Sequence, residues 1–123
     1  MLDKRQIRRN TIVWADLGTH KGHIQSGLRP CIVVSCNKAN KHAPVYTVIP
    51  GTTQYDKREF PVHFEIKPSD IEGFLKKNTI FLTEQICTID AEQVLSIAGN
   101  VISTEAVEVI NKMIMRQLEL GVA

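Results

Sequence analysis

The chain has 123 residues, of which 43% are hydrophobic and 23% are charged, and its net charge is +2. This length and composition are typical of one globular domain, here expected over residues 1–123, whose core needs neither disulfides nor a metal. The small net charge does not by itself indicate a nucleic-acid partner. No apolar run approaches the ~20 residues of a membrane-spanning helix.

The first ten residues are charged and lack the apolar segment of a secretory signal, so we expect a cytoplasmic protein. The basic stretch 1–10 is interpreted as a flexible arm, with a solvated end favoured over an RNA contact. A β-branched and aromatic run at 11–17 predicts a strand. Residues 18–27 form a polar loop whose length is typical of functional loops. The continuously apolar run 31–35 predicts a strand covered on both faces.

Residues 37–44 form a polar connection with room for one helical turn, and 45–49 predict another strand. A second long loop, polar and partly basic, covers 50–60. The alternation of apolar and polar residues over 62–67 predicts a half-buried strand. After a turn at 68–74, the stretch 78–89 holds either one long strand or two short ones.

From Ser103 the apolar period becomes helical, and Ser103 or Thr104 can cap the helix while Gly121 can end it. The stripe is wide enough for a thick core or for contact with another subunit. We therefore predict a mainly β protein with a C-terminal helix (α+β), in which short strands form a small curled barrel or sandwich. The predicted apolar stripe consists of Ala106, Val107, Val109, Ile110, Met113, Ile114 and Leu118.

A metal site is not expected from the cysteines and histidines. Cys31 and Cys36 are five residues apart, which places them on opposite faces of a regular strand. His20 and His23 lack a third ligand nearby in the sequence, whereas structural zinc sites take four. The odd count of three cysteines, the third being Cys87, indicates free thiols that serve as small packing groups.

The polar loops carry mainly hydrogen-bond donors, and donors suit an anion. No nucleophile-elbow, P-loop or dinucleotide motif is present. Arg29, at the start of an apolar strand, offers a planar fork that matches phosphate oxygens. The segment Gly51–Gln54 adds two hydroxyls and an amide, and Gly51 would let the backbone approach a ligand. Each signal is also compatible with an ordinary surface loop.

Several blocks, in order and at compatible spacing, resemble the MazF/PemK family of toxin endoribonucleases from bacterial type II toxin–antitoxin modules. They are "VWADLG…KG…QSGLRPCIVVS", "VIPGTTQ", "FPVHFEI" and "LTEQICTID", and they span about Thr11 to Asp90. The resemblance implies an SH3-like CcdB/PemK-type barrel, usually a homodimer. It implies metal-independent cleavage of single-stranded RNA such as mRNA at short sequences, and inhibition by an antitoxin whose acidic, partly disordered tail lies along the RNA groove.

The same resemblance assigns the catalytic roles. Arg29 falls on the family's catalytic arginine, Thr52 on its catalytic threonine, and Gln25 on the glutamine of its "G-S-E-Q" loop. Two departures stand in the blocks that shape the RNA groove: the loop here reads "KGHIQ", and Cys87 stands where a basic residue is common. Both bear on sequence preference, and neither changes Arg29 or Thr52.

The mechanism expected from this assignment uses the RNA 2′-hydroxyl as nucleophile and leaves a 2′,3′-cyclic phosphate and a 5′-hydroxyl. Arg29 and Thr52 would stabilise the charge on the phosphoryl oxygens. His23 is a candidate general base, because histidine titrates in the useful range, although a loop histidine is more often a surface residue. The residues expected to contact RNA are Lys21, Gln25, Thr53, Gln54, Lys57, Arg58 and Gln85.

Two other functions remain open on the sequence alone. A CcdB-like toxin would share the fold and poison DNA gyrase, and RNA would then stay intact. A non-catalytic SH3-like module would bind RNA or a peptide tail without cutting it. The departures from the family pattern at Ile24 and Cys87 are compatible with such a non-catalytic module.

Overall fold

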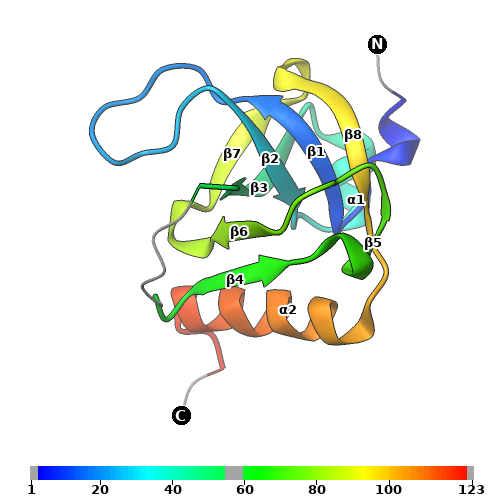
Figure 1. Ribbon diagram of the computed structural model, residues 1–123. Helices are drawn as coiled ribbons and strands as arrows, with labels where there is room; N and C mark the ends of the chain where they lie inside the picture. The colour runs from blue at the N-terminus through cyan, green and yellow to red at the C-terminus, as the bar shows by residue number, and fades with distance from the viewer. Residues whose placement is uncertain (1–2, 55–59, 122–123) are drawn as a thin grey trace.

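The computed structural model describes residues 3–54 and 60–121 and shows a curled antiparallel sheet with one long helix packed against it (Figure 1). The strand order is β4-β6-β3-β2-β1-β8-β5, and β7 pairs with β3 off this path. The strands are β1 Thr11–Asp16, β2 Leu28–Val33, β3 Val45–Thr52, β4 His63–Ile66, β5 Ile71–Gly73, β6 Thr79–Leu82, β7 Cys87–Asp90 and β8 Val94–Val101; the helices are α1 Asn37–His42 and α2 Thr104–Leu118.

This architecture confirms the predicted fold class of a small, mainly β barrel with a C-terminal helix. The stretch 78–89 forms two short strands, β6 and β7, separated by a 3-10 turn at Thr83–Gln85. Two strands were not predicted, β5 and β8, and β8 is the partner of β1. No helix in the described ranges, 3–54 and 60–121, is long and apolar enough to cross a membrane.

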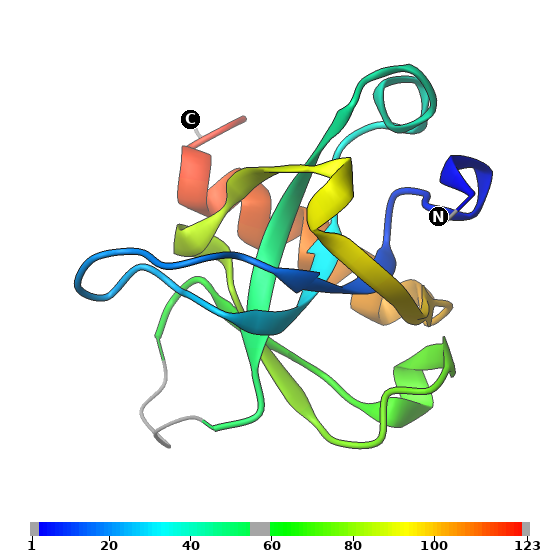
Figure 2. The same cartoon turned by 90° about the horizontal axis from the view of Figure 1, so that it is seen from above.

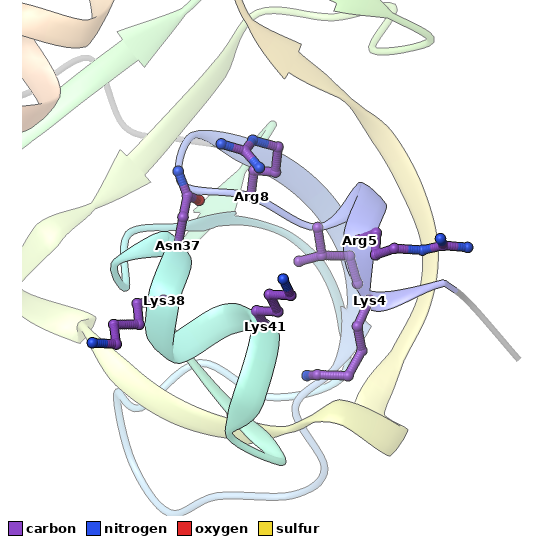
Figure 3. A pocket seen from close by; sticks show the side chains of 7 residues that line it. Lys4, Arg5, Arg8, Asn37, Lys38 and Lys41 are labelled. Carbon is purple, nitrogen blue, oxygen red and sulfur yellow. The ribbon is translucent and has the colours of Figure 1, made fainter.

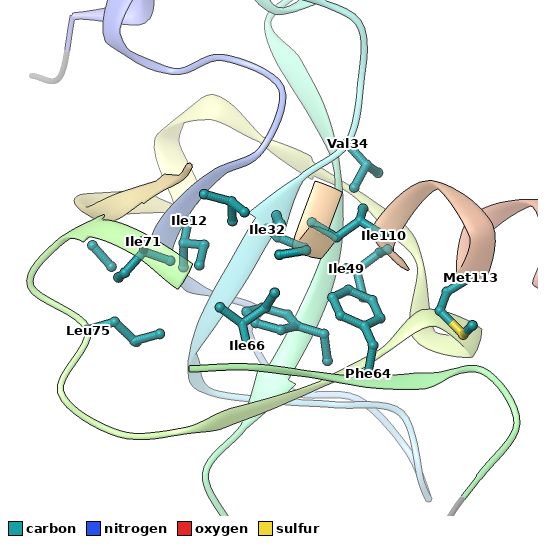
Figure 4. Packing of buried hydrophobic residues seen from close by; sticks show 14 residues of the cluster. Ile12, Ile32, Val34, Ile49, Phe64, Ile66, Ile71, Leu75, Ile110 and Met113 are labelled. Carbon is teal, nitrogen blue, oxygen red and sulfur yellow. The ribbon is translucent and has the colours of Figure 1, made fainter. Parts of the chain in front are cut away.

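The core has two parts on the two faces of the curled sheet. On β2, Ile32 packs in the cluster under α2, while Cys31 and Val33 pack in the cluster on the other face. The prediction that this strand is covered on both faces is therefore confirmed. In the larger cluster, the rings of Phe64 and Phe81 stack with centroids 5.5 Å apart (Figure 4).

Helix α2 begins where the sequence predicts and packs against one face of the curled sheet, below β4 in Figure 1 and behind the strands in Figure 2. The Ser103 hydroxyl caps it by accepting from the Ala106 amide at 3.2 Å. The helix ends at Leu118, where Glu119 adopts a left-handed conformation with φ 54°, so the residue that ends it is Glu119 and not Gly121. Only part of the predicted stripe is buried, since Leu118 stays half exposed.

Strand β3 is the centre of the sheet because it pairs with β2, β6 and β7. Gly51 is buried at its C-terminal end, and a Cβ there would lie 2.8 Å from Thr79 Cγ2 and 2.9 Å from Phe81 Cε1. The expectation that Gly51 lets a ligand approach the backbone is therefore wrong. Glycine is needed here because β6 packs against β3.

The basic segment before β1 contacts the barrel along most of its length, whereas the sequence indicated a flexible arm. Ile7 is buried in the second core cluster. The Lys4 ammonium donates to the Tyr46 hydroxyl at 2.7 Å and lies 4.1 Å from the centre of that ring. The Arg9 amide donates to the Asn37 side chain at 2.7 Å. One buried isoleucine and these polar contacts anchor residues 4–9.

Candidate active site

Arg29 and Thr52, far apart in the sequence, lie side by side on neighbouring antiparallel strands. The register of β2 and β3 pairs Cys31 with Pro50. Continued by two residues, it sets Arg29 opposite Thr52. The two side chains extend on the same face, and Arg29 Nη1 lies 3.5 Å from Thr52 Oγ1. The sheet thus brings the two candidate catalytic groups together.

The guanidinium is oriented by the loop that precedes its strand. Arg29 Nε donates to the Ser26 carbonyl at 3.0 Å, which leaves Nη2 without a hydrogen-bond partner among the described residues. Within those residues no carboxylate pairs with Arg29. The side chain is half-buried. The positive charge is therefore positioned but not neutralised, as an anion site requires.

Thr52 ends β3 and has its hydroxyl in a local turn. Thr52 Oγ1 accepts from the Gln54 amide at 3.1 Å and donates to the Gln54 carbonyl at 2.9 Å. Thr53 and Gln54 are exposed beyond it. Two further residues expected to contact RNA, Lys57 and Arg58, lie outside the described residues.

The loop over 18–27 is fixed from below by Gln85. Gln85 Oε1 accepts from the Gln25 amide at 3.3 Å, and Gln85 Nε2 donates to the His23 carbonyl at 3.0 Å. The structure thus brings Gln25 and Gln85 together, although both polar atoms of the Gln85 amide are engaged with the loop backbone. Lys21 and the imidazole of His23 are exposed on the loop.

A cavity of about 180 Å³ lies beside Gln25 under this loop. The side-chain oxygen Oε1 of Gln25 is buried and has no hydrogen-bond partner among the described residues. Several residues that line the cavity carry no sequence signal for a site, because they come from segments up to 76 residues apart. The lining residues are Leu17, His20, Ile24, Gln25, Pro50, Gln85, Cys87, Thr88, Ile89 and Gln93.

All three cysteines are free, and two are poor nucleophiles. Burial raises the pKa of the Cys31 thiol to about 12, and burial also raises the pKa of Cys87. These thiols stay protonated near neutral pH, as packing groups do. In the described part of the chain, no group of three or more potential ligands could hold a metal ion.

This burial predicts the order in which the thiols react. Because a thiol reacts as thiolate and must be reached by the reagent, we expect iodoacetamide at pH 8 to modify exposed Cys36 and to spare Cys31. Mass spectrometry after labelling of native and urea-unfolded protein measures this, and the unfolded chain should gain all three adducts. Equal labelling of Cys31 in the native protein would contradict the packing role.

Comparison with known proteins decides the family. Residues 8–118 match the family model described as PemK-like, MazF-like toxin of type II toxin–antitoxin system. The chain belongs to this family. The resemblance seen in the sequence is therefore confirmed. A curated MazF-type relative, Endoribonuclease MazF of Staphylococcus saprophyticus, is 34% identical over 84 residues, which cover 68% of this chain and 68% of the relative.

Solved structures of MazF proteins share the fold. An endoribonuclease from a mycobacterial species, solved in complex with its cognate antitoxin, superposes with a TM-score of 0.70 at 22% identity, over 94% of this chain and 96% of the other. MazF from Deinococcus radiodurans gives a TM-score of 0.74 at 15% identity, over 91% and 96% of the two chains. At these identities the likeness concerns the fold.

Proposed function

We propose that this protein, a MazF-type toxin endoribonuclease by family, cuts single-stranded RNA at a site formed by Arg29 and Thr52. The observation that carries the proposal is the unneutralised guanidinium 3.5 Å from the threonine hydroxyl. Each side chain is fixed to its own strand of one sheet, so the pair is arranged before substrate arrives. The family match over 8–118 supports one catalytic domain.

RNA supplies the nucleophile, so the protein has to align the 2′-hydroxyl with the phosphodiester and stabilise the charge that develops on phosphorus. The free Nη2 of Arg29 binds a non-bridging oxygen. The Thr52 hydroxyl turns from the Gln54 carbonyl to the same phosphoryl group. The bond from the 2′-oxygen to phosphorus forms as the 2′-hydroxyl loses its proton to a base, while the bond to the 5′-oxygen breaks. The 5′-oxygen takes up a proton from Arg29 or from water, and this leaves a 2′,3′-cyclic phosphate and a 5′-hydroxyl.

His23 is the proposed general base, and its position makes this role dependent on substrate. Its imidazole is exposed and makes no hydrogen bond to Arg29 or Thr52 in the described structure, while its carbonyl is held by Gln85. We expect His23→Ala to lower the single-turnover rate of RNA cleavage, because the variant lacks the imidazole that would take the proton. If the variant cuts RNA at the wild-type rate, His23 is not the base.

The surroundings of the pair fit an unpaired strand. Lys21 and Gln54 are exposed on the loops beside the site, and the Lys21 ammonium would give salt-dependent affinity. A cognate antitoxin with an acidic tail is the proposed partner, in line with the mycobacterial endoribonuclease solved with its antitoxin. We propose a homodimer as the active form in the cytoplasm.

The decisive experiment is incubation of the purified protein with a long mixed-sequence RNA in EDTA, followed by mapping of the cut ends. We expect cuts at a short recurrent sequence, with cyclic-phosphate and 5′-hydroxyl ends. A single 2′-deoxy substitution 5′ to the cut should block the reaction at that site. Intact RNA, or cleavage that survives the substitution, would contradict the mechanism.

A matched pair of threonine variants tests the second catalytic group. Thr52→Val keeps the shape and removes the donor, and we expect a loss of ~10²–10³-fold in the single-turnover rate. Thr47→Val, on the same strand β3 but at its other end, should cut like the wild type. Equal rates for the two variants would remove Thr52 from the mechanism.

A further inference from the structure

A second feature lies at the opposite end of the strands from Arg29 and Thr52. A hollow of about 330 Å³ is formed between the segment before β1 and helix α1 (Figure 3). Five of the fifteen basic residues of the chain line it, whereas the whole chain carries a net charge of only +2. We call it the basic pocket. Its lining residues are Lys4, Arg5, Ile7, Arg8, Asn37, Lys38 and Lys41.

Most of the positive charge in the basic pocket is available to a ligand. Lys38 and Lys41 on α1 and the guanidinium of Arg8 have no hydrogen-bond or ion-pair partner among the residues the structure describes. Arg5 is paired with Asp3 at 2.9 Å. Lys4 is held by Tyr46, which fixes one cation at the pocket wall. Figure 3 shows the basic side chains arranged around the hollow on the two segments, with Lys4 and Lys41 extending toward the space between them.

Clustered, unpaired cations repel one another and are favourable when an anion joins them. Ile7 is buried at the base of this surface, so the cations stand on a packed segment rather than on a loose one. Lysine and arginine together bind phosphate, lysine as a point charge and arginine through its planar fork. The chemistry of the pocket is therefore that of a site for several phosphate groups.

The spacing to the active site fits one extended strand of nucleic acid. Tyr46, which contacts Lys4, and Thr52 stand at the two ends of β3. Six residues of strand cover about 20 Å, which is the length of about six stacked nucleotides at ~3.4 Å each. The two ends of β3 also lie far apart in Figure 2, where the strand is seen along its length. An RNA cut at Arg29 is long enough to reach the basic pocket, whereas a short oligonucleotide is not.

We propose that the basic pocket binds phosphates of the RNA strand that flanks the cut segment and so favours long substrates. This inference rests on the proposed function for the identity of the ligand as RNA. It assigns Arg8, Lys38 and Lys41 to binding alone, since they lie far from the reacting phosphate. An acidic peptide would use the same charges and is distinguished by the experiment.

The test compares two RNAs that carry a 2′-deoxy nucleotide at a central cut position, one of about 6 nucleotides and one of about 30. The short RNA extends only about three nucleotides, or ~10 Å, to either side of the cut, whereas the long RNA exceeds the ~20 Å span on both sides. The triple variant Arg8→Gln, Lys38→Gln, Lys41→Gln is compared with Lys76→Gln, Lys77→Gln, two exposed lysines outside the pocket. We expect the triple variant to bind the long RNA ~10-fold more weakly at low salt, with the slope of log K against log salt smaller by ~2. The short RNA should bind and, in its all-ribose form, be cut as by the wild type.

Unchanged affinity of the triple variant for the long RNA, or an equal loss in the Lys76, Lys77 control, would overturn the proposal. Loss of poly-glutamate binding with full retention of long-RNA binding would also overturn it, in favour of an acidic protein partner. Thermal melting of each variant excludes unfolding as the cause. Failure of the proposed function looks different, because the wild type would then leave both RNAs uncut in their all-ribose form, while the pocket would still bind the long one.

Discussion

Replacing Arg29 by alanine is expected to lower the single-turnover rate of RNA cleavage by ~10³-fold or more, the largest effect of any substitution in this chain. The guanidinium lies 3.5 Å from the Thr52 hydroxyl on the shared face of β2 and β3. Donors directed at charge that develops in the transition state are worth ~10²–10³-fold when neutral, and a charged fork is worth more.

The variant Arg29→Lys tests whether a positive charge is sufficient for cleavage or whether the planar guanidinium is also required. Lysine keeps the positive charge, but it cannot donate to the Ser26 carbonyl and present a second nitrogen to the phosphate at the same time. We expect Arg29→Lys to recover only a small part of the lost rate. Circular dichroism and melting should show both variants folded, because Arg29 is half-buried and belongs to neither core cluster. Wild-type rates in either folded variant would disprove the assignment.

Ile110→Ala is expected to reduce the free energy of unfolding by about 2–5 kcal/mol, the largest stability effect predicted here. Ile110 is fully buried, at 0% exposure, where α2 packs on the sheet (Figure 4). Truncation removes the buried side chain and leaves a cavity in the core cluster that also contains Ile32, Ile49 and Phe64. Because the total free energy of unfolding of a native protein is about 5–15 kcal/mol, this loss is a large fraction of it.

Leu118→Ala is the matched control, because it shortens an aliphatic side chain of the same helix that is 48% exposed. We expect a loss below about 1 kcal/mol. Urea unfolding measures the loss of stability in both variants. The urea concentration at the midpoint should fall for Ile110→Ala, while the slope of the free energy of unfolding against urea concentration stays constant. Equal losses in the two variants would mean that α2 does not cover the core in the way described.

Much of the sheet follows from sequence because each of the predicted strands carries its own pattern. The apolar run before Ser35 and the alternation around Phe64 identify strands without reference to their neighbours. Strand β8 has no such signal. Ser96, Gly99 and Asn100 interrupt its apolar residues, and it is a strand because β1 and β5 pair with it. Tertiary pairing decides here over local propensity.

The candidate site was predictable only in part, because the distance between its two residues depends on the register of two paired strands. The residue types of Arg29 and Thr52 indicated an anion site, and the family resemblance assigned their roles. Their proximity depends on which residue of β2 faces which residue of β3, and a shift by one would place them on opposite faces. The hydrogen bonds between Gln85 and the loop over 18–27 join segments that are distant in the sequence, and so does the basic pocket. No local sequence pattern indicates such contacts.

The reacting pair stands on two hydrogen-bonded strands, whereas the residues expected to choose the RNA stand on the loop over 18–27 and beyond Thr52. The charge-stabilising pair and most of the selecting side chains are thereby built on separate parts of the polypeptide. Changes in loop side chains such as Lys21 can retune which bases are accepted, while the Ser26 backbone carbonyl still holds the guanidinium beside the hydroxyl. One scaffold of this kind can diversify its targets during evolution while its rate-determining geometry stays constant.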